Sequence, residues 1–189
     1  MSIVATSGAP SEYRPKVPAD FLLIIGDREP LGWILTEEVM AFSAHRSRQV
    51  ALVEKGDRLF LYTTRGCFHS PNKDRGRIIG EATVATPIST LDVPVKFGES
   101  EFPIGCELRI DGLVPRSKGL LMNDLVKDLH LFPNQGPKSW GVQLRRVLAP
   151  IDKHDANILH KKLERVVKPL SQTRSEYLSR TSFAHPPST

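Results

Sequence analysis

Short apolar runs bounded by glycine, proline or aspartate recur along the chain and predict β-strands. One run is continuously apolar, which is typical of a buried strand, and others alternate apolar with polar positions. Gly80, inside one run, predicts a β-bulge or a close backbone approach. The expected strands are DFLLIIGD at 20–27, RLFLYTT at 58–64, RIIGEATVAT at 77–86, CELRIDGLV at 106–114 and SWGVQLRRVLAPI at 139–151.

Helical spacing and capping residues predict helices between these strands. Thr36 is a good N-cap and is followed by two glutamates, and a second helix is expected after Ser43. Apolar residues recur at helical spacing in 121–132, and Asp152 caps a final basic helix over 153–167. About five or six strands with flanking helices favour a mixed β-barrel of the α+β class over a parallel, doubly wound sheet.

Composition divides the chain into a body and two tails. Residues 1–18 are rich in proline and small residues, and residues 170–189 are rich in serine and threonine and close on a proline pair. Both segments are expected to be flexible. A chain of 189 residues, 40% of them hydrophobic, can bury one substantial core, so residues 19–169 are predicted to form one domain.

The charge balance and the cysteines suggest a setting for this domain. A formal net charge of +5 favours polyanionic partners, although solubility alone could explain it. Cys67 and Cys106 are too few for a disulfide framework, and the apolar run FLLII at 21–25 is far shorter than a membrane span. We expect a cytoplasmic protein that does not contact a membrane.

The loop expected at 65–77 combines basic and aromatic side chains. Phe68 and His69 lie among arginines, and exposed aromatic side chains beside arginines can stack on nucleic-acid bases. The loop is long for a hairpin connection, and such loops are often functional. We interpret it as the mouth of a binding site. A solvated basic face or a disordered connection is the alternative.

The series RSRQVALVEKGDRLFLYTTRG, RIIGEATV, ELRIDGLVP, LLMNDLVKDL and SWGVQLRRVL, within residues 21–163, resembles the EVE domain. This family has a PUA-like fold and is related to the YTH and ASCH domains. The resemblance implies a PUA-like barrel that takes a modified base of DNA or RNA out of its stack and holds it in an aromatic pocket. Where related proteins have a Trp-Gly-Val-Pro-like stretch, this chain has MAFS at 40–43, which leaves the preferred base undefined.

Two sets of residues follow as candidates for this site. The end of the 58–64 strand opens toward a ligand, and the resemblance adds the tryptophan that begins the last strand and the MAFS segment that replaces a cage wall. The expected base-binding residues are Trp140, Tyr62, Thr63, Met40, Phe42 and Ser43. The expected phosphate-binding residues, placed on one common rim, are His45, Arg46, Arg48, Arg65, Lys73, Arg75, Arg77 and Lys138.

The sequence motifs for catalysis or metal binding are weaker than those for nucleic-acid binding. Cys67, His69 and Cys106 do not have the spacing of a structural zinc site. A cysteine nucleophile needs a base oriented by a third group, and residues as close in sequence as Cys67 and His69 rarely achieve that geometry. The sequence has no HExxH motif, P-loop or dinucleotide fingerprint. We therefore predict a non-catalytic binding domain that uses no cofactor. It is expected to be a monomer or a weak dimer, and a separate effector protein is expected to carry out the step that follows binding. An enzyme acting on a nucleotide-like small molecule and a protein-interaction module are the alternatives.

Overall fold

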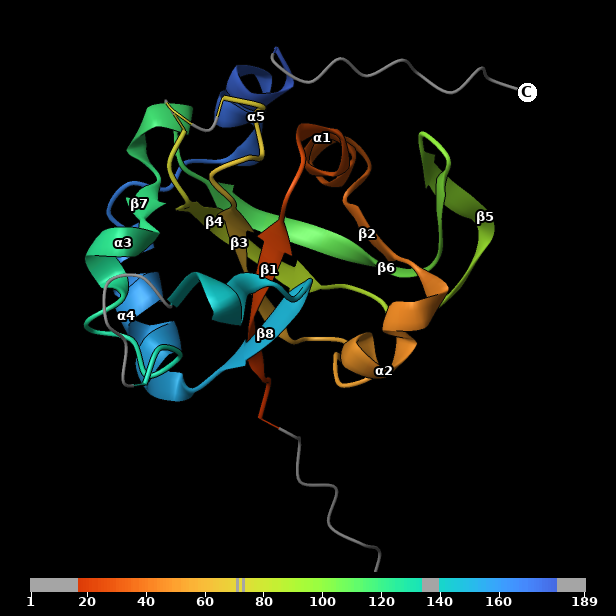
Figure 1. Cartoon of the computed structure of the whole chain (residues 1–189), viewed down its shortest axis with the longest axis horizontal. Coiled ribbons are helices and arrows are strands. Elements are labelled where there is room, and N and C mark those ends of the chain that lie inside the picture. The colour runs from red at the N-terminus through yellow and green to blue at the C-terminus, as the bar shows by residue number, and fades with distance from the viewer. Residues whose placement is uncertain (1–16, 71, 73, 134–139, 180–189) are drawn as a thin grey trace, which may run out of the picture.

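A curled mixed β-sheet forms the centre of the computed structural model, which describes residues 17–70, 72, 74–133 and 140–179 (Figure 1). Its main path follows the order β2-β6-β4-β3-β1-β8, while β5 pairs with β6 and β7 pairs with β4. The main path has six strands, and the whole sheet has eight within the described residues, against the five or six that the sequence predicts. The strands are β1 (Asp20–Ile25), β2 (Val39–Phe42), β3 (Arg58–Thr63), β4 (Arg77–Val84), β5 (Ser89–Phe97), β6 (Ser100–Leu113), β7 (Leu120–Leu121) and β8 (Leu148–Ile151).

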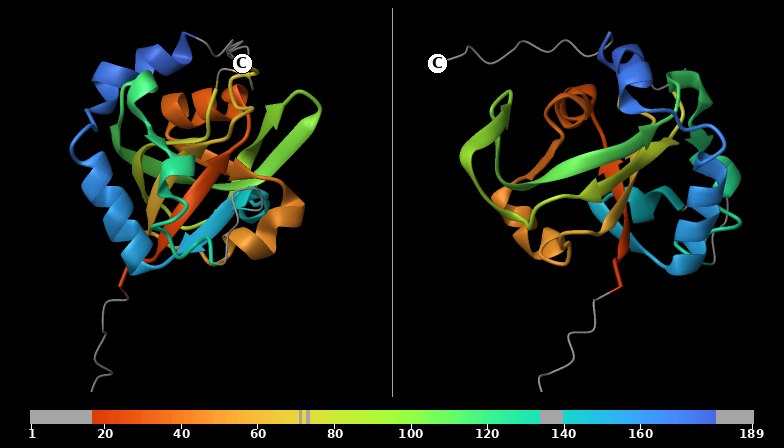
Figure 2. Two further views of the ribbon diagram at one scale, coloured as in Figure 1. Left: turned by 60° about the vertical axis from the view of Figure 1, so that its left-hand side comes forward. Right: turned by 180° about the vertical axis from the view of Figure 1, so that it is seen from behind.

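Helices flank the curled sheet on several sides, as Figure 2 shows. Helices α1 and α5 lie beyond one end of the strands, and α2 lies beyond the other (Figure 1). No helix within the described ranges is long and apolar enough to cross a lipid bilayer. The α-helices are α1 (Arg28–Glu37), α2 (Ser47–Val50), α3 (Met122–Leu125), α4 (Lys153–Leu163) and α5 (Leu170–Leu178), and the 3₁₀ turns are η1 (Ala44–Arg46), η2 (Arg116–Lys118) and η3 (Trp140–Leu144).

The central strands are buried because their sequences are apolar on both faces. All six residues of β1 are buried, and Leu59, Phe60 and Leu61 of β3 are fully buried. The strands β1 and β3 are parallel neighbours in register from Asp20–Arg58 to Ile25–Thr63. Parallel strands in the middle of a sheet are covered on both faces, which explains the continuous apolar run that begins the domain.

The strand directions decide which residues can share a site. The antiparallel pairs β3–β4, β4–β6 and β6–β2 make β2 run opposite to β3. The C-terminal ends of β1 and β3 therefore lie at one end of the sheet, and the C-terminal end of β2 lies at the other (Figure 1). We call these the β3 end and the β2 end of the sheet.

Gly80 has the role that the strand pattern predicts. The β3–β4 register shifts between Leu61 and Tyr62, opposite Gly80, and the β4–β6 register shifts one residue further along β4. A Cβ atom at Gly80 would collide with the carbonyl oxygen of Gly112 on β6. The prediction of a bulge with a close backbone approach is confirmed.

Three element predictions are wrong. The first helix begins at Arg28 rather than Thr36, because Asp27 is its N-cap and accepts a hydrogen bond from the Glu29 N–H, 3.0 Å. The helix expected over 121–132 is only α3, and residues 140–144 form η3 where a strand is expected. Three strands are missing from the expected set: β5, whose sequence contains a proline, the two-residue β7, and β2, which lies where the helix from Thr36 is expected.

The boundary expected at residue 169 is also wrong. Residues 170–178 form α5, and Tyr177 within it is fully buried, with its hydroxyl donating to the Val114 carbonyl oxygen at 2.8 Å. Leu170, Thr173 and Tyr177 follow helical spacing, a signal that the serine- and threonine-rich composition conceals. The outer parts of both expected tails, 1–16 and 180–189, are outside the described residues.

Candidate nucleic-acid interface

The segment 64–76 leaves β3 and packs on the β3 end of the sheet. Its backbone is tied to β1 by the hydrogen bond from the Thr64 N–H to the Ile25 carbonyl oxygen, 3.0 Å. The ring of His69 lies 2.7 Å from the Asp27 carboxylate at the start of α1. Cys67 is fully buried beneath the segment. The loop therefore has fixed attachments at both β1 and α1.

The last two residues of β3 face different pockets. Side chains alternate along a strand, so Tyr62 and Thr63 point to opposite faces. Tyr62 lines a pocket of about 510 Å³, and Thr63 lines a second pocket of about 470 Å³. Asp74 and Arg75 line both. We call these the Tyr62 pocket and the Thr63 pocket, which adjoin at Asp74 and Arg75.

The Thr63 pocket brings together cationic side chains from three segments. Arg77 comes from β4 and donates to the Gly119 carbonyl oxygen at 2.7 Å. Arg116, in η2, places its guanidinium 4.5 Å from the centre of the Phe68 ring and 3.7 Å from the Asp74 carboxylate. The lining residues are Thr63, Phe68, Asp74, Arg75, Arg77, Ile79, Arg116, Glu176, Tyr177 and Ser179. With three arginines against two carboxylates, this pocket carries a small positive excess.

The Tyr62 pocket has a phenol at its floor and polar walls. Tyr62 is 3% exposed, and burial raises the pKa of its hydroxyl to about 12, so the group is a neutral donor or acceptor at physiological pH. A Cβ atom at Gly76 would overlap the Tyr62 hydroxyl, so only glycine fits there. The lining residues are Tyr62, Arg65, Asn72, Asp74, Arg75, Gly76, Leu121 and Asn123.

The structure thus brings five predicted residues together at the β3 end: Tyr62, Thr63, Arg65, Arg75 and Arg77. Sequence reasoning missed Arg116 and the α5 wall, because both follow the site by many residues and neither belongs to a recognisable motif. Lys73 and Lys138 are outside the described residues, as is the side chain of Trp140. The η3 turn that begins at Trp140 precedes β8, which starts beside the end of β1.

The prediction that all candidates share one rim is wrong. Ser43, His45, Arg46 and Arg48 follow β2 and lie at the β2 end, because β2 runs opposite to β3. Figure 1 shows α2 and the 64–76 loop on opposite sides of the molecule.

The expectation that Met40 or Phe42 replaces a cage wall is also wrong. They are 1% and 4% exposed and belong to the hydrophobic core. Their partners on β6, Cys106 and Ile104, continue that core. Tyr62 is as buried as these two residues but lines a pocket, whereas neither Met40 nor Phe42 lines the Tyr62 pocket or the Thr63 pocket.

Phe68 differs from the exposed stacking residue that the sequence suggests. Its ring is half-buried, 6.5 Å from the ring of Tyr177, and the Arg116 guanidinium covers its face. Phe68 therefore holds the loop against α5 and positions Arg116.

The cysteines are unsuited to nucleophilic chemistry. Cys67 and Cys106 are 0% and 3% exposed, and burial raises the pKa of each thiol to about 12. Thiolates are the reactive form, so both groups are inert near neutral pH. Cys67, His69 and Cys106 do not form a metal-binding cluster within the described ranges.

Comparison with known proteins identifies the architecture. No protein-family model and no curated protein sequence matches the chain. Among solved structures, the Pho92 YTH domain in complex with m6A superposes with a TM-score of 0.54 at 13% identity, covering 94% of this chain and 92% of that one. The YTH domain of Zygosaccharomyces rouxii MRB1, in complex with N6-methyladenosine RNA, gives 0.50 at 12% identity, with 84% and 92% covered.

The chain has the PUA-like fold of the YTH domains. A hypothetical protein from Leishmania major shares the fold, with a TM-score of 0.52 at 14% identity over 80% of this chain and 99% of that one. The predicted PUA-like α+β class is confirmed. At these identities the likeness establishes the fold alone. The positions of binding side chains must come from the structure of this chain.

Proposed function

We propose that this chain is a non-catalytic nucleic-acid-binding domain that holds a flipped or modified base at the β3 end of its sheet. The observation that carries the proposal is the meeting of two pockets at Asp74 and Arg75, beneath arginines from β4 and η2 and beside the phenol of Tyr62. Membership of the EVE branch of PUA-like folds is part of the proposal and depends on the ordered sequence motifs.

The pockets have dimensions and chemistry suited to a base. Both fall within the range of about 300–1,000 Å³ that is usual for small-molecule sites. Taking a base out of its stack costs a few kcal/mol, which stacking and hydrogen bonds to the base edge recover. Asn72, Asn123 and the Tyr62 hydroxyl offer donors and acceptors to that edge. Trp140 remains a proposed aromatic wall.

The arginines beside the pockets suit the flanking phosphates. Arg65 and Arg75 are exposed, whereas Arg77 is fixed by its bond to Gly119. Guanidinium groups bind phosphate oxygens through paired hydrogen bonds, and such contacts set affinity and position without reading sequence. We therefore assign the pockets to base recognition and the exposed arginines to the backbone.

Binding rather than catalysis is supported by two further points. The buried, high-pKa thiols remove the candidate nucleophiles. Two YTH domains that share the fold are described in complex with m6A and with N6-methyladenosine RNA. A modified base in RNA or DNA is the ligand class that the proposal names, and an effector protein would supply the consequence of binding.

An oligonucleotide array at two salt concentrations tests the proposal. We expect single-stranded oligonucleotides carrying a methylated base to bind more tightly than unmodified ones, and all binding to weaken as salt rises. Tyr62→Phe should reduce the discrimination between modified and plain oligonucleotides, while Arg75→Ala should weaken both about equally. Absence of binding at low salt would exclude the proposed function and favour a protein-interaction module.

A further inference from the structure

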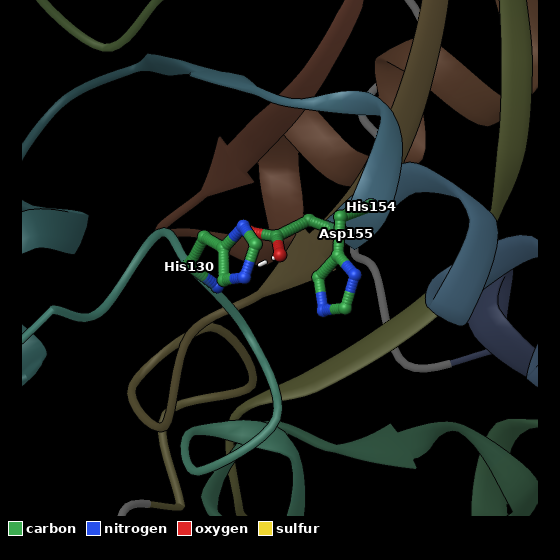
Figure 3. Close-up of side chains that lie close together, drawn as sticks. All are labelled: His130, His154 and Asp155. Carbon is green, nitrogen blue, oxygen red and sulfur yellow. Dashed lines mark hydrogen bonds between the residues drawn. The ribbon is translucent and has the colours of Figure 1, made fainter.

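A second group of side chains lies away from the pockets, where the segment after α3 meets the start of α4. Figure 3 shows His130 on that segment facing His154 and Asp155 of α4. Each of the three residues offers one potential ligand atom, and these atoms lie within 4.8 Å of one another. From this juxtaposition we propose a binding site for a divalent transition-metal ion such as Zn²⁺, held by His130, His154 and Asp155.

The hydrogen bonds of the two histidines leave one nitrogen of each ring for a metal. His130 Nδ1 lies 2.7 Å from the Asp152 carboxylate, and His154 Nε2 lies 3.2 Å from the Asp128 carbonyl oxygen. Both partners are acceptors, so these nitrogens carry the ring protons when the imidazoles are neutral. The lone pairs are then on His130 Nε2 and His154 Nδ1. An outer carboxylate that fixes a ligating histidine, as Asp152 fixes His130, is a regular feature of metal sites.

The Asp155 carboxylate supplies a fixed anionic oxygen. It is 1% exposed, and its two oxygens accept the backbone N–H groups of His130 at 2.7 Å and Leu131 at 2.8 Å. A carboxylate has about four lone-pair sites, so two remain after these bonds. Asp155 therefore holds the loop against α4 and still has acceptor capacity toward the histidines.

One ring must turn before the ion can be bound. The imidazoles are stacked, with 4.0 Å between ring centres and 9° between planes, so their lone pairs run parallel instead of converging. His154 is exposed and its hydrogen bond to Asp128 is the longer one, which makes it the ring that turns. Turning releases that bond, so either nitrogen of His154 can then bind the ion. His130 keeps the orientation that Asp152 gives it.

The ligand chemistry selects the class of ion. Two imidazoles and one carboxylate suit Zn²⁺, Ni²⁺, Co²⁺ or Cu²⁺, whereas Mg²⁺ and Ca²⁺ prefer oxygen ligands. The carboxylates of Asp152 and Asp155 offset the positive end of the α4 dipole, which would otherwise oppose a cation there. The bound ion would fasten the segment after α3 to α4, a role separate from the pockets.

Calorimetric titration of tag-free full-length protein with Zn²⁺ tests the site. We expect one saturable site in the wild type, at least about tenfold weaker binding after His154→Gln or His130→Gln, and no binding of Mg²⁺ there. Asp152→Asn should weaken Zn²⁺ binding about 10–100-fold, because it changes the partner of His130 while asparagine still caps α4. His160→Gln is the matched control, since His160 is on the same helix and also contacts a carboxylate, that of Glu81.

Two outcomes would overturn the site. One is no Zn²⁺ binding by the wild type, and the other is binding that His154→Gln and His130→Gln leave unchanged or that His160→Gln weakens equally. Thermal unfolding without metal shows whether each variant is folded. NMR of the wild type avoids variants altogether: the ring signals of His130 and His154 should shift on adding Zn²⁺, while those of His160 should not.

Discussion

The β3 end and the β2 end of the sheet both carry basic residues and both have a pocket. Arginines line the two pockets at the β3 end, whereas the pocket of about 560 Å³ beside α2 has Lys55 as the one basic residue among the described residues that line it. Arg77 and Arg116 are held there by Gly119, Phe68 and Asp74. At the β2 end, Arg48 is exposed on the short helix α2, and Arg46 donates to the Gln49 side chain at 3.3 Å. The comparison teaches that a count of basic residues does not define a binding site. The β3 end differs because fixed contacts hold its arginines in the lining of its pockets.

Truncating a side chain should reduce the free energy of unfolding far more at the β3 end than at the β2 end. Tyr177→Ala removes a fully buried ring beneath the Thr63 pocket and should lower the free energy of unfolding by about 3–5 kcal/mol. Leu52→Ala at the β2 end, where the side chain is 65% exposed, should change it by less than about 0.5 kcal/mol. Urea unfolding measures both. A loss below about 1 kcal/mol for Tyr177→Ala would show that α5 is not a fixed wall.

Two glycines of the 64–76 loop sharpen the comparison within the β3 end. Gly76→Ala should cost about 1–3 kcal/mol and partly close the Tyr62 pocket, because its Cβ would overlap the Tyr62 hydroxyl. Gly66→Ala meets nothing within 4 Å and should be close to neutral. Thermal unfolding and the intensity of tyrosine fluorescence are suitable measurements. Equal effects for the two variants would mean that Tyr62 does not contact the loop as described.

Single arginine variants compare the two ends as phosphate-binding surfaces. Arg75→Ala should weaken oligonucleotide binding by about 1 kcal/mol and reduce the slope of log affinity against log salt by about 1. Arg48→Ala, also exposed but on α2 at the β2 end, should leave both quantities unchanged. Anisotropy titrations over a salt series give these numbers. A larger loss for Arg48→Ala would transfer the interface to the β2 end.

The smallest effect concerns the link between the loop and α1. Partial burial would raise the pKa of Asp27, but hydrogen bonds from the Glu29 N–H and His69 outweigh it and lower that pKa below 3.8. A lowered pKa stabilises the fold above the unfolded-state value and ceases to do so as the pH falls through the folded-state value. Asp27→Asn, which retains the cap, should therefore cost about 0.2–1 kcal/mol at about pH 5 and less at about pH 2.5. A pH-independent cost in urea unfolding would contradict this link.

Periodicity predicted the central strands well because β1, β3 and β4 are apolar in the way that buried strands require. It failed where other interactions decide the structure. Helix α1 begins after Asp27 rather than at Thr36, because the Asp27 carboxylate caps the helix by accepting a hydrogen bond from a free backbone N–H in its first turn. α5 was concealed because its polar residues dominate its composition while the few that matter, Thr173 and Tyr177, are buried.

The candidate site was predictable only in part for a topological reason. Tyr62, Thr63, Arg75 and Arg77 are near one another in sequence and at one hairpin, so their proximity follows locally. The position of the residues after β2 depends on three successive antiparallel pairings, which no local pattern reveals. Arg116 reaches the site only through the fold.

The most direct test of the β3 end as the interface is amide NMR during titration with a single-stranded oligonucleotide that carries a modified base. The account predicts shifts in loop 64–76, η2 and α5, with residues 43–50 unchanged. Shifts confined to residues 43–50 and the β5–β6 hairpin, with loop 64–76 unaffected, would contradict it.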